Sequence, residues 1–511
     1  MDNLKSKYIA SIKLSAMADA LGWITEFEKS EVDLIKKYDT NRITKFHPWS
    51  KNVGGRFYGY VDYIKEGSYS DDTQLMLAVA RSINSSADVD QVFFAKNELP
   101  NWLYYARGGG RTIKQAADKI QRKSANWYSN FYTYSIKDQK VDYRDTGANG
   151  AAMRVLPIAL ANFKNEENIK ANIFSNSIIT HGHPRALLGA MLYGVVINRF
   201  LSADPNNFEF KNVLTEIGSN FNETFNLSFL NSVELLKWEE EWNKSSDISF
   251  RDTYDEICAE TQEYLRVVFK SLNKDVTVYE TLDKLGCFAN QTKGSGTSTV
   301  IGGLYLALKF VNNPEEGILQ AVNALGTDTD SIAAFTGSLL GALHGEKIIP
   351  NKWNNVQDVT YLEGIAEKLY LINKKKFKDK EDFLLAPVLK SANKPKTDNF
   401  QINEEIEFSP LGKGKIIEID RQKTLTKGKY NLILSINLDI GQSIIVTYIF
   451  DENEDTTYLK DSIKSDEFND LLVLAKSKLK PFAYKDLEVF LKNNNSNDIL
   501  NIFKTIIENK A

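Results

Sequence analysis

A chain of 511 residues is long enough for two or more domains, and its 42% of apolar residues can fill a sizeable core. Lys and Arg number 63 against 67 Asp and Glu, and the resulting net charge of −4 excludes the basic footprint of a nucleic-acid or anionic-membrane binder. Cys258 and Cys287 are too few for a disulfide framework or a zinc set.

The cellular setting is predicted from what the sequence lacks. Two cysteines are typical of a reducing compartment. The first 22 residues have no apolar run of the kind found in a secretory signal, and no stretch of about 18 apolar residues predicts a membrane span. We therefore expect a cytoplasmic protein with no membrane partner.

Residues 1–372 are predicted to form one mainly helical domain, in which strand-like alternation is nearly absent. Its helical segments place apolar residues three and four positions apart or are apolar almost all round. Small residues recur within them and favour close helix packing. The clearest segments are TQLMLAVARSI (73–83), AAMRVLPIALANF (151–163), ALLGAMLYGVVINRFL (186–201), TVIGGLYLALKFV (299–311) and SIAAFTGSLLGALHG (331–345).

The character of the chain changes after this domain. Residues 373–400 are rich in lysine and polar residues and are predicted to be a linker. Residues 401–511 are predicted to form a small α+β module, barrel-like in its strands, because three β-branched segments between 412 and 450 precede helical patterning. A slight acidic excess argues against nucleic-acid binding by this module, so a protein partner or a structural role is expected.

Two clusters combine hydroxyl groups with paired aspartates, each at the predicted start of a buried helix. The first is SDDT, with Ser70, Asp71 and Asp72, and the second is DTDS, with Asp328, Asp330 and Ser331. Helix capping explains one Ser, Thr or Asp at such a position, since these residues satisfy the first amide groups and the helix dipole. Capping alone does not require so many carboxylates.

A metal centre is the functional interpretation of these clusters. If the two helix starts meet, four aspartates repel one another unless a cation lies between them. Oxygen ligands without His or Cys select Mg²⁺, Ca²⁺ or Mn²⁺, and four carboxylates balance two divalent ions. A third acidic stretch contains Asp19 and Glu26, although from the residues alone Glu26 is an ordinary surface glutamate.

Four loops rich in glycine or small polar residues precede predicted helices, where backbone N–H groups can bind an anion. Glycine is also an ordinary turn former, so each loop taken alone is weak support for a ligand site. The loops fit neither the P-loop nor the dinucleotide-binding pattern. His181 and His183 match no familiar metal spacing. The four loops are RGGGR (107–111), TGANGAAMR (146–154), THGHP (180–184) and TKGSGTS (292–298).

Taken in order, these stretches resemble the ADP-ribosylglycohydrolase family. DALGWITE, SDDTQ, ARGGG, GANGAAMR, THGHP and GTDTDSIAAFTGSLLGALHG carry the resemblance over about residues 10–345. The paired SDDT and DTDS motifs are its specific part. Ala148 within GANGAAMR, Thr327 before the last motif and Ser70 in place of a frequent threonine depart from the common pattern, but none of them removes an expected metal ligand.

The resemblance implies an all-helical fold with two Mg²⁺ ions in a cleft, Mn²⁺ being an alternative. The implied metal ligands are Ser70, Asp71, Asp72, Asp328, Asp330 and Ser331. The implied catalytic residues are Glu26, near the scissile bond, and Asp72 and Asp328. The implied contacts to ADP-ribose are Gly110, Gly147, Asn149, Gly150 and His181, with Gly294 and Ser295 as a softer match.

The expected function is Mg²⁺-dependent hydrolysis of the N- or O-glycosidic bond at C1″ of ADP-ribose, which removes ADP-ribose from a protein, nucleic acid or small molecule. The alternatives are a non-catalytic reader of ADP-ribose or another nucleotide, and a binuclear Mg²⁺ phosphoester hydrolase. Tyr104, Trp127 and Tyr132 are candidates for stacking on the adenine, and residues 84–145 are expected to shape the choice of target.

Overall fold

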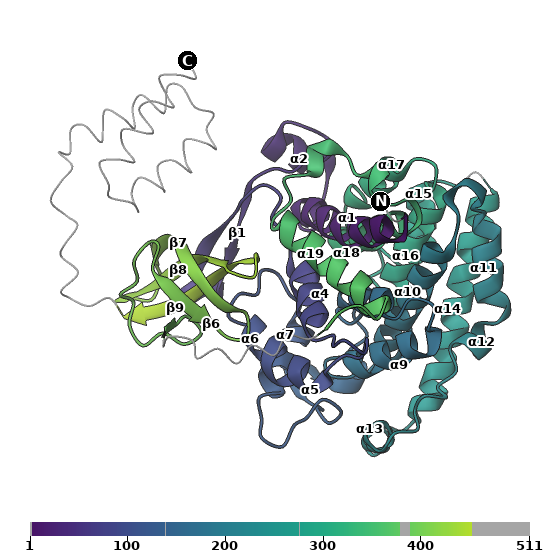
Figure 1. Ribbon diagram of the computed structural model, residues 1–511, viewed down its shortest axis with the longest axis horizontal. Coiled ribbons are helices and arrows are strands. Elements are labelled where there is room, and N and C mark those ends of the chain that lie inside the picture. The colour runs from purple at the N-terminus through teal and green to yellow at the C-terminus, as the bar shows by residue number, and fades with distance from the viewer. Residues whose placement is uncertain (1–2, 138, 275, 379–388, 452–511) are drawn as a thin grey trace.

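The computed structural model describes residues 3–137, 139–274, 276–378 and 389–451. A body of packed helices is followed by a sheet that lies beside it, drawn in yellow-green at the left of Figure 1. The helices are α1 (Asn3–Thr25), α2 (Glu31–Tyr38), α3 (Gly55–Tyr58), α4 (Asp71–Arg81), α5 (Gln91–Phe93), α6 (Leu99–Trp102), α7 (Arg111–Lys119), α8 (Leu156–Ala161), α9 (Glu166–Ser177), α10 (Pro184–Ser202), α11 (Phe210–Ser219), α12 (Phe221–Thr224), α13 (Val233–Asn243), α14 (Phe250–Asn273), α15 (Val278–Lys284), α16 (Gly296–Lys309), α17 (Pro314–Val322), α18 (Thr329–His344) and α19 (Val359–Asn373).

The expectation of an all-helical first domain was wrong in one respect, because two antiparallel hairpins interrupt the helices. Strand β1 (Trp49–Val53) pairs with β2 (Tyr60–Ile64), and β3 (Thr133–Ile136) pairs with β4 (Gln139–Asp142). The strands have four or five residues, and apart from Asp62 and Ile64 on β2 their residues are half-buried or exposed. Short, half-buried strands carry little apolar alternation, so the sequence pattern does not reveal them.

Helices α1 and α18 cross in direct backbone contact at the centre of the helical body. A Cβ atom on Gly22 would lie 2.5 Å from the Cα atom of Asp330, and a Cβ atom on Gly337 would lie 2.5 Å from the carbonyl oxygen of Leu14. Only glycine permits so close an approach. The small residues noted in these segments therefore fix the end of α1, followed at once by Glu26, beside the start of α18.

Within residues 389–451, no pairing between β5 and β9 closes the C-terminal sheet into the expected barrel. Its strand order is β5-β6-β7-β8-β9, with β5 parallel to β6 and the other neighbours antiparallel. Strand β5 lies within the stretch expected to be a linker. The helices expected after the strands fall in 452–511, outside the described residues. The strands are β5 (Lys390–Ser391), β6 (Glu405–Phe408), β7 (Gly412–Lys423), β8 (Lys429–Leu438) and β9 (Ser443–Asp451).

The sheet packs against the helical body as part of one continuous apolar core. Phe408 on β6 lies edge-on to Tyr105, with 5.7 Å between ring centroids. Hairpin β1–β2 lies between the sheet and the helices (Figure 1). Cys258 and Cys287 are buried and free. None of the helices in the described ranges has the length and apolarity needed to cross a bilayer.

The contact between α1 and α18 predicts the effect of adding one methyl group. Gly22→Ala should lower the urea midpoint of unfolding, because the new Cβ atom meets backbone atoms that cannot move aside. We expect the free energy of unfolding to fall by about 1–3 kcal/mol. Gly364→Ala is the matched control: Gly364 lies on α19 with nothing within 4 Å of its Cβ position. The control should be neutral or stabilising by up to about 1 kcal/mol. Equal midpoints for the two variants would contradict the packing described.

Candidate active site

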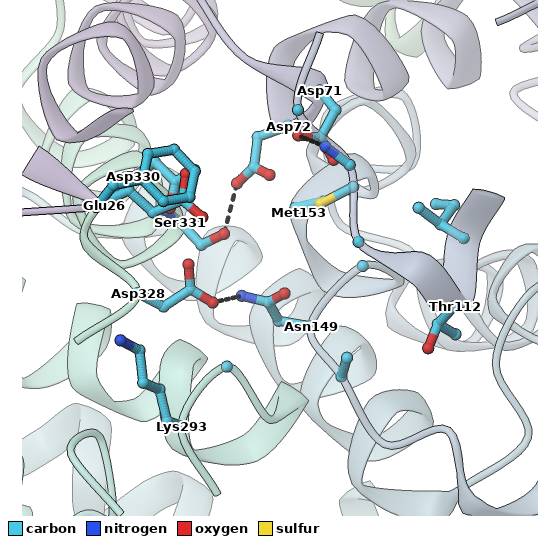
Figure 2. A pocket seen from close by; sticks show the side chains of 18 of the residues that line it. Glu26, Asp71, Asp72, Thr112, Asn149, Met153, Lys293, Asp328, Asp330 and Ser331 are labelled. Carbon is cyan, nitrogen blue, oxygen red and sulfur yellow. Dashed lines mark hydrogen bonds between the residues drawn. The ribbon is translucent and has the colours of Figure 1, made fainter. Parts of the chain in front are cut away.

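A cavity of about 720 Å³ opens where the N-termini of α4 and α18 meet (Figure 2). Ser331 at the start of α18 donates a 2.6 Å hydrogen bond from Oγ to Oδ2 of Asp72 on α4, across 259 positions of sequence. The two hydroxyl–aspartate clusters therefore come together. The cavity is lined by Glu26, Phe27, Lys51, Asn52, Val53, Asp71, Asp72, Gly108, Gly109, Gly110, Thr112, Ile113, Ala148, Asn149, Gly150, Met153, His181, Lys293, Gly294, Asp328, Asp330 and Ser331.

Five carboxylates face this cavity, and three of them are in close contact. Oxygen atoms of Glu26, Asp328 and Asp330 lie within 4.8 Å of one another. Burial, followed by repulsion from Asp328 and Asp71, raises the pKa of Glu26 to about 8. Burial and neighbouring carboxylates also raise the pKa of Asp330 and of Asp72 well above the usual range. The cluster resists carrying its full negative charge without a cation.

Hydrogen bonds from the chain orient the carboxylates. Asp71 accepts a 2.6 Å bond on Oδ1 from the Gly109 N–H. A Cβ atom on Gly108, whose φ is +102°, would lie 2.3 Å from the same oxygen, so the loop needs glycine there. Asp328 accepts a 2.9 Å bond on Oδ2 from the side-chain amide of Asn149. Each aspartate is thus fixed by a neighbouring segment.

Ser70 and Asp19 lie behind the cavity lining. The Ser70 hydroxyl caps α4 by accepting a 3.2 Å bond from the Asp72 N–H, and Ser70 is not among the lining residues. In this structure the Ser70 side chain therefore acts as a helix cap. Asp19 accepts from the backbone N–H of Ser70 and of Thr73, and from the Thr73 hydroxyl at 2.5 Å. Burial raises the pKa of Asp19 to about 6, the largest effect on that group.

The glycine loops contribute five of their seven predicted residues to the cavity lining. Two lie behind it: Gly147 accepts from the Gly296 N–H at 2.9 Å, and Ser295 caps α16. The Asn149 N–H donates to the Gly294 carbonyl at 2.8 Å and joins two of the loops. The residues that line the cavity are Gly110, Asn149, Gly150, His181 and Gly294.

His181 is a neutral group in this site. Burial, followed by the charge of Arg154, lowers the pKa of His181 to about 3. Its Nδ1 lies 2.8 Å from the Thr180 hydroxyl. The carboxylate group described above contains neither His181 nor His183, whose side chain caps α10. Both histidines thus have local partners that account for their positions.

None of the three aromatic residues expected to stack on an adenine lines the cavity. Tyr132 is buried and donates from its hydroxyl to the Thr180 carbonyl at 2.7 Å. Tyr104 and Trp127 pack partly buried against the core. Among the described residues, the aromatic side chain in the lining is Phe27, which is 56% exposed.

Several lining residues were missed from the sequence. Lys51, Asn52 and Val53 belong to β1, a strand that the pattern did not predict, so no sequence signal pointed to them. Lys293 is different, because it precedes Gly294 in a loop already identified as a candidate. A basic residue next to such a loop is a signal that a closer look at the sequence could have used.

The donor set fits a hard divalent cation. Glu26, Asp328 and Asp330 offer clustered carboxylate oxygens, and Asp71, Asp72 and Ser331 add further oxygen atoms to the same cavity. Oxygen-only sites favour Mg²⁺ or Mn²⁺ over softer metals. The raised pKa values of the carboxylates are the expected sign of a site whose missing charge is supplied by a metal.

Comparison with known proteins identifies the family of the chain and several relatives. The sequence model described as ADP-ribosylglycohydrolase matches residues 1–378. The ADP-ribosylarginine hydrolase Tri1 of Serratia proteamaculans is 21% identical over 364 residues, covering 70% of this chain and 76% of that protein. The ADP-ribosylhydrolase ARH3 of Danio rerio is 22% identical, covering 59% of this chain and 77% of that protein.

A third relative and a solved structure cover different shares of the chain. The ADP-ribosyl dinitrogen reductase glycohydrolase of Rhodospirillum rubrum is 26% identical over 193 residues, covering 37% of this chain and 57% of that protein. A structure titled ADP-ribosylglycohydrolase-related protein complex covers 73% of this chain and 100% of its own, with 18% identity and a TM-score of 0.44.

The raised pKa of Glu26 predicts a pH-dependent loss of stability in chelator-treated protein. Below the ordinary pKa of 4.5 the group is protonated in both the folded and the unfolded state, so it costs nothing. Between 4.5 and about 8 the unfolded state loses the proton first, and folded stability falls as pH rises. Between pH 4.5 and about 8, the melting temperature of the wild type should fall by roughly a few degrees more than the melting temperature of Glu26→Gln. If the melting temperatures of the wild type and of Glu26→Gln change equally with pH, the buried, carboxylate-rich environment assigned to Glu26 is wrong.

Proposed function

Because the chain belongs to the ADP-ribosylglycohydrolase family, we propose that it hydrolyses the glycosidic bond at C1″ of ADP-ribose and so removes ADP-ribose from a modified target. The observation that carries this proposal is the contact between Ser331 and Asp72, which joins the two acidic helix starts beside Glu26. The cavity also lies within the size range of small-molecule sites, roughly 300–1,000 Å³.

The proposed cofactor is a pair of Mg²⁺ ions, which Mn²⁺ can replace. Asp71, Asp72, Asp328, Asp330 and Ser331 are the proposed ligands, with Ser70 joining them if its hydroxyl turns from its capping position. When bound, the metal supplies positive charge that offsets the clustered carboxylates, orients substrate oxygens and activates water. The oxygen-only donor set and the raised pKa values of Asp72 and Asp330 support this assignment.

The substrate is proposed to lie with its diphosphate along the glycine loops. Backbone N–H groups near the start of a helix attract anions, and the loops at Gly110 and Gly150 both precede helical turns. Lys293 adds a positive charge to the cavity lining. Gly147 and Ser295 would support these loops from behind, while Asn149 contacts Asp328 directly.

Glu26 is the proposed acid–base residue. Cleavage of a glycosidic bond passes through an oxocarbenium-like state, which neighbouring carboxylates stabilise. A carboxyl group with a raised pKa can give a proton to the departing atom and accept one from water at neutral pH. Asp72 and Asp328 would act by fixing the geometry around C1″, each held by a hydrogen bond from another segment.

The decisive experiment is an assay of ADP-ribosylated substrates with and without Mg²⁺. Peptides modified on serine and on arginine test the O- and N-linked cases, the second suggested by the relative named for ADP-ribosylarginine. Free ADP-ribose as the product supports the proposal. Release of inorganic phosphate would instead indicate a phosphoesterase, and tight binding of ADP-ribose without turnover would indicate a reader.

Removing one proposed metal ligand should separate catalysis from folding. Asp328→Asn keeps the size of the side chain but removes the charge, so we expect Mg²⁺-dependent ADP-ribose release to fall at least about 100-fold. The melting temperature of the chelator-treated variant should not fall, since one repelling charge is gone. Asp439→Asn, on the exposed β8–β9 turn, is the control and should keep full activity. Full activity in Asp328→Asn would refute the metal assignment.

A further inference from the structure

We propose that β1 forms the target-facing side of the cavity, that Lys51 contacts the group from which ADP-ribose is removed, and that the C-terminal sheet positions this strand through Gln422. The inference rests on the proposed function and deepens it. Residues 51–53 are called the β1 wall below. Neither the wall nor the sheet was connected with the site by any sequence motif.

Lys51 carries a positive charge into the cavity without neutralising it in an ion pair. Its Nζ atom lies 4.2 Å from the ring centroid of Trp23, with Phe27 and Trp49 at 5.8 and 5.7 Å. Among the described residues no carboxylate pairs with this atom within 4.0 Å, although burial lowers the pKa of Lys51 and the nearby Asp62, Glu26 and Asp71 partly offset that lowering. Asp62, directly opposite Lys51 in the hairpin, is paired instead with Arg107 at 2.7 Å. The ammonium group is therefore available to a ligand.

The β1 wall lies on the Glu26 side of the cavity, because Lys51 Nζ lies 5.8 Å from the ring centroid of Phe27, the residue after Glu26, and its charge acts on Glu26. In Figure 2, Glu26 and Asp330 lie on one side, and Thr112 and Met153 lie across from them. The Gly110 loop, which precedes Thr112 directly, belongs to this far side. With the diphosphate on the glycine loops, C1″ reaches the carboxylates and the departing group points toward Glu26, Phe27 and Lys51. The target is thus expected to meet β1.

Residues of the C-terminal sheet form hydrogen bonds to main-chain groups of hairpin β1–β2. The side-chain amide of Gln422 on β7 accepts from the Val61 N–H at 2.9 Å and donates to the Val61 carbonyl at 3.0 Å, as a paired strand would. Val61 is the register partner of Asn52 in the β1 wall. Thr426 adds two bonds to the Phe57 carbonyl, at 3.1 Å from its N–H and 3.0 Å from its hydroxyl.

The charge of Lys51 suggests which targets are accepted. A cation at the target side attracts carboxylates near the modified residue and repels basic ones, so target sequences with acidic neighbours are favoured. It also disfavours a departing guanidinium group. We therefore assign the substrate class as targets whose modified residue is uncharged after release and has acidic flanking residues.

The first test uses the full-length chain with Mg²⁺ and three ADP-ribosylated peptides: serine-modified with acidic flanks, serine-modified with basic flanks, and arginine-modified. Wild type should prefer the acidic peptide. Lys51→Ala should lower kcat/KM for that peptide about tenfold, and Lys51→Glu should reverse the preference between flanks. The Kd for free ADP-ribose, measured by calorimetry, should stay within about twofold, since Lys51 would not touch that part of the substrate.

Three results would overturn the assignment of Lys51. A matching loss of affinity for free ADP-ribose would mean that Lys51 contacts the diphosphate. Unchanged kcat/KM in both variants would mean that it contacts no part of the substrate. A wild-type preference for the arginine-modified peptide would refute the substrate class.

The second test addresses the positioning role of Gln422. Gln422→Ala should raise KM for the acidic peptide about fivefold while leaving kcat and the Kd for ADP-ribose close to wild type, because only the β1 wall shifts. Gln401→Ala, an exposed glutamine before β6, is the matched control and should behave as wild type. Identical KM values for the two variants would refute the positioning role. If the wild type releases ADP-ribose from none of the peptides, the proposed function fails; if it does and the variants are unaffected, only this inference fails.

Discussion

Repulsion between buried carboxylates is the constraint on which the rest of the site depends. The start of α4 and the start of α18 bring Asp71, Asp72, Asp328 and Asp330 to one cavity, and the end of α1 adds Glu26. Such an arrangement is costly unless a cation is present or protons are retained. The glycine contacts between α1 and α18 hold the end of α1, next to Glu26, beside Asp330. Packing thus maintains a cluster of carboxylates whose repulsion is relieved by a cation or by retained protons.

The site is held from outside by the C-terminal sheet at more than one place. Arg81, at the end of α4, donates to the side chain of Gln442 at 2.7 Å and is paired with Glu98. Asp358 accepts bonds from the Tyr69 hydroxyl at 2.6 Å and from the Ser443 N–H at 2.9 Å. Tyr69 directly precedes the first acidic cluster. The sheet therefore braces both ends of the helix that carries Asp71 and Asp72.

The helical body and the acidic core of the site could be predicted from the sequence, because their signals are local. Apolar spacing identifies long helices, and two groups of carboxylates at helix starts are unusual enough to suggest a shared cation. The sequence could not show that Asp72 and Ser331 meet. The metal site was predicted only on the condition that the two helix starts come together, which depends on packing between distant segments. The separation of Gly110, in the lining, from Gly147, behind it, also depends on how the loops fold.

Other features could not be predicted for equally physical reasons. Strand β1 is short and half-exposed, so Lys51 had no pattern to mark it. The Ser70 hydroxyl can cap a helix or bind a metal, and the sequence is the same for both. Asp19 was visible as an acidic residue, but its role as acceptor for the first turn of α4 required the fold. The open edge of the sheet depends on strand pairing that composition does not determine.

The bonds from Arg81 and Asp358 to the sheet have a consequence for how such chains can evolve. The family match ends at residue 378, yet two residues beyond it are connected to the helix that carries the acidic cluster. Gln442 bonds Arg81 on that helix, and Ser443 bonds Asp358, which in turn bonds Tyr69 just before it. A substitution at Gln442 would therefore affect the end of α4 through Arg81, and one at Ser443 would affect its start through Asp358 and Tyr69. The two parts of the chain are not independently inheritable modules, and changes in one are expected to be accompanied by compensating changes in the other.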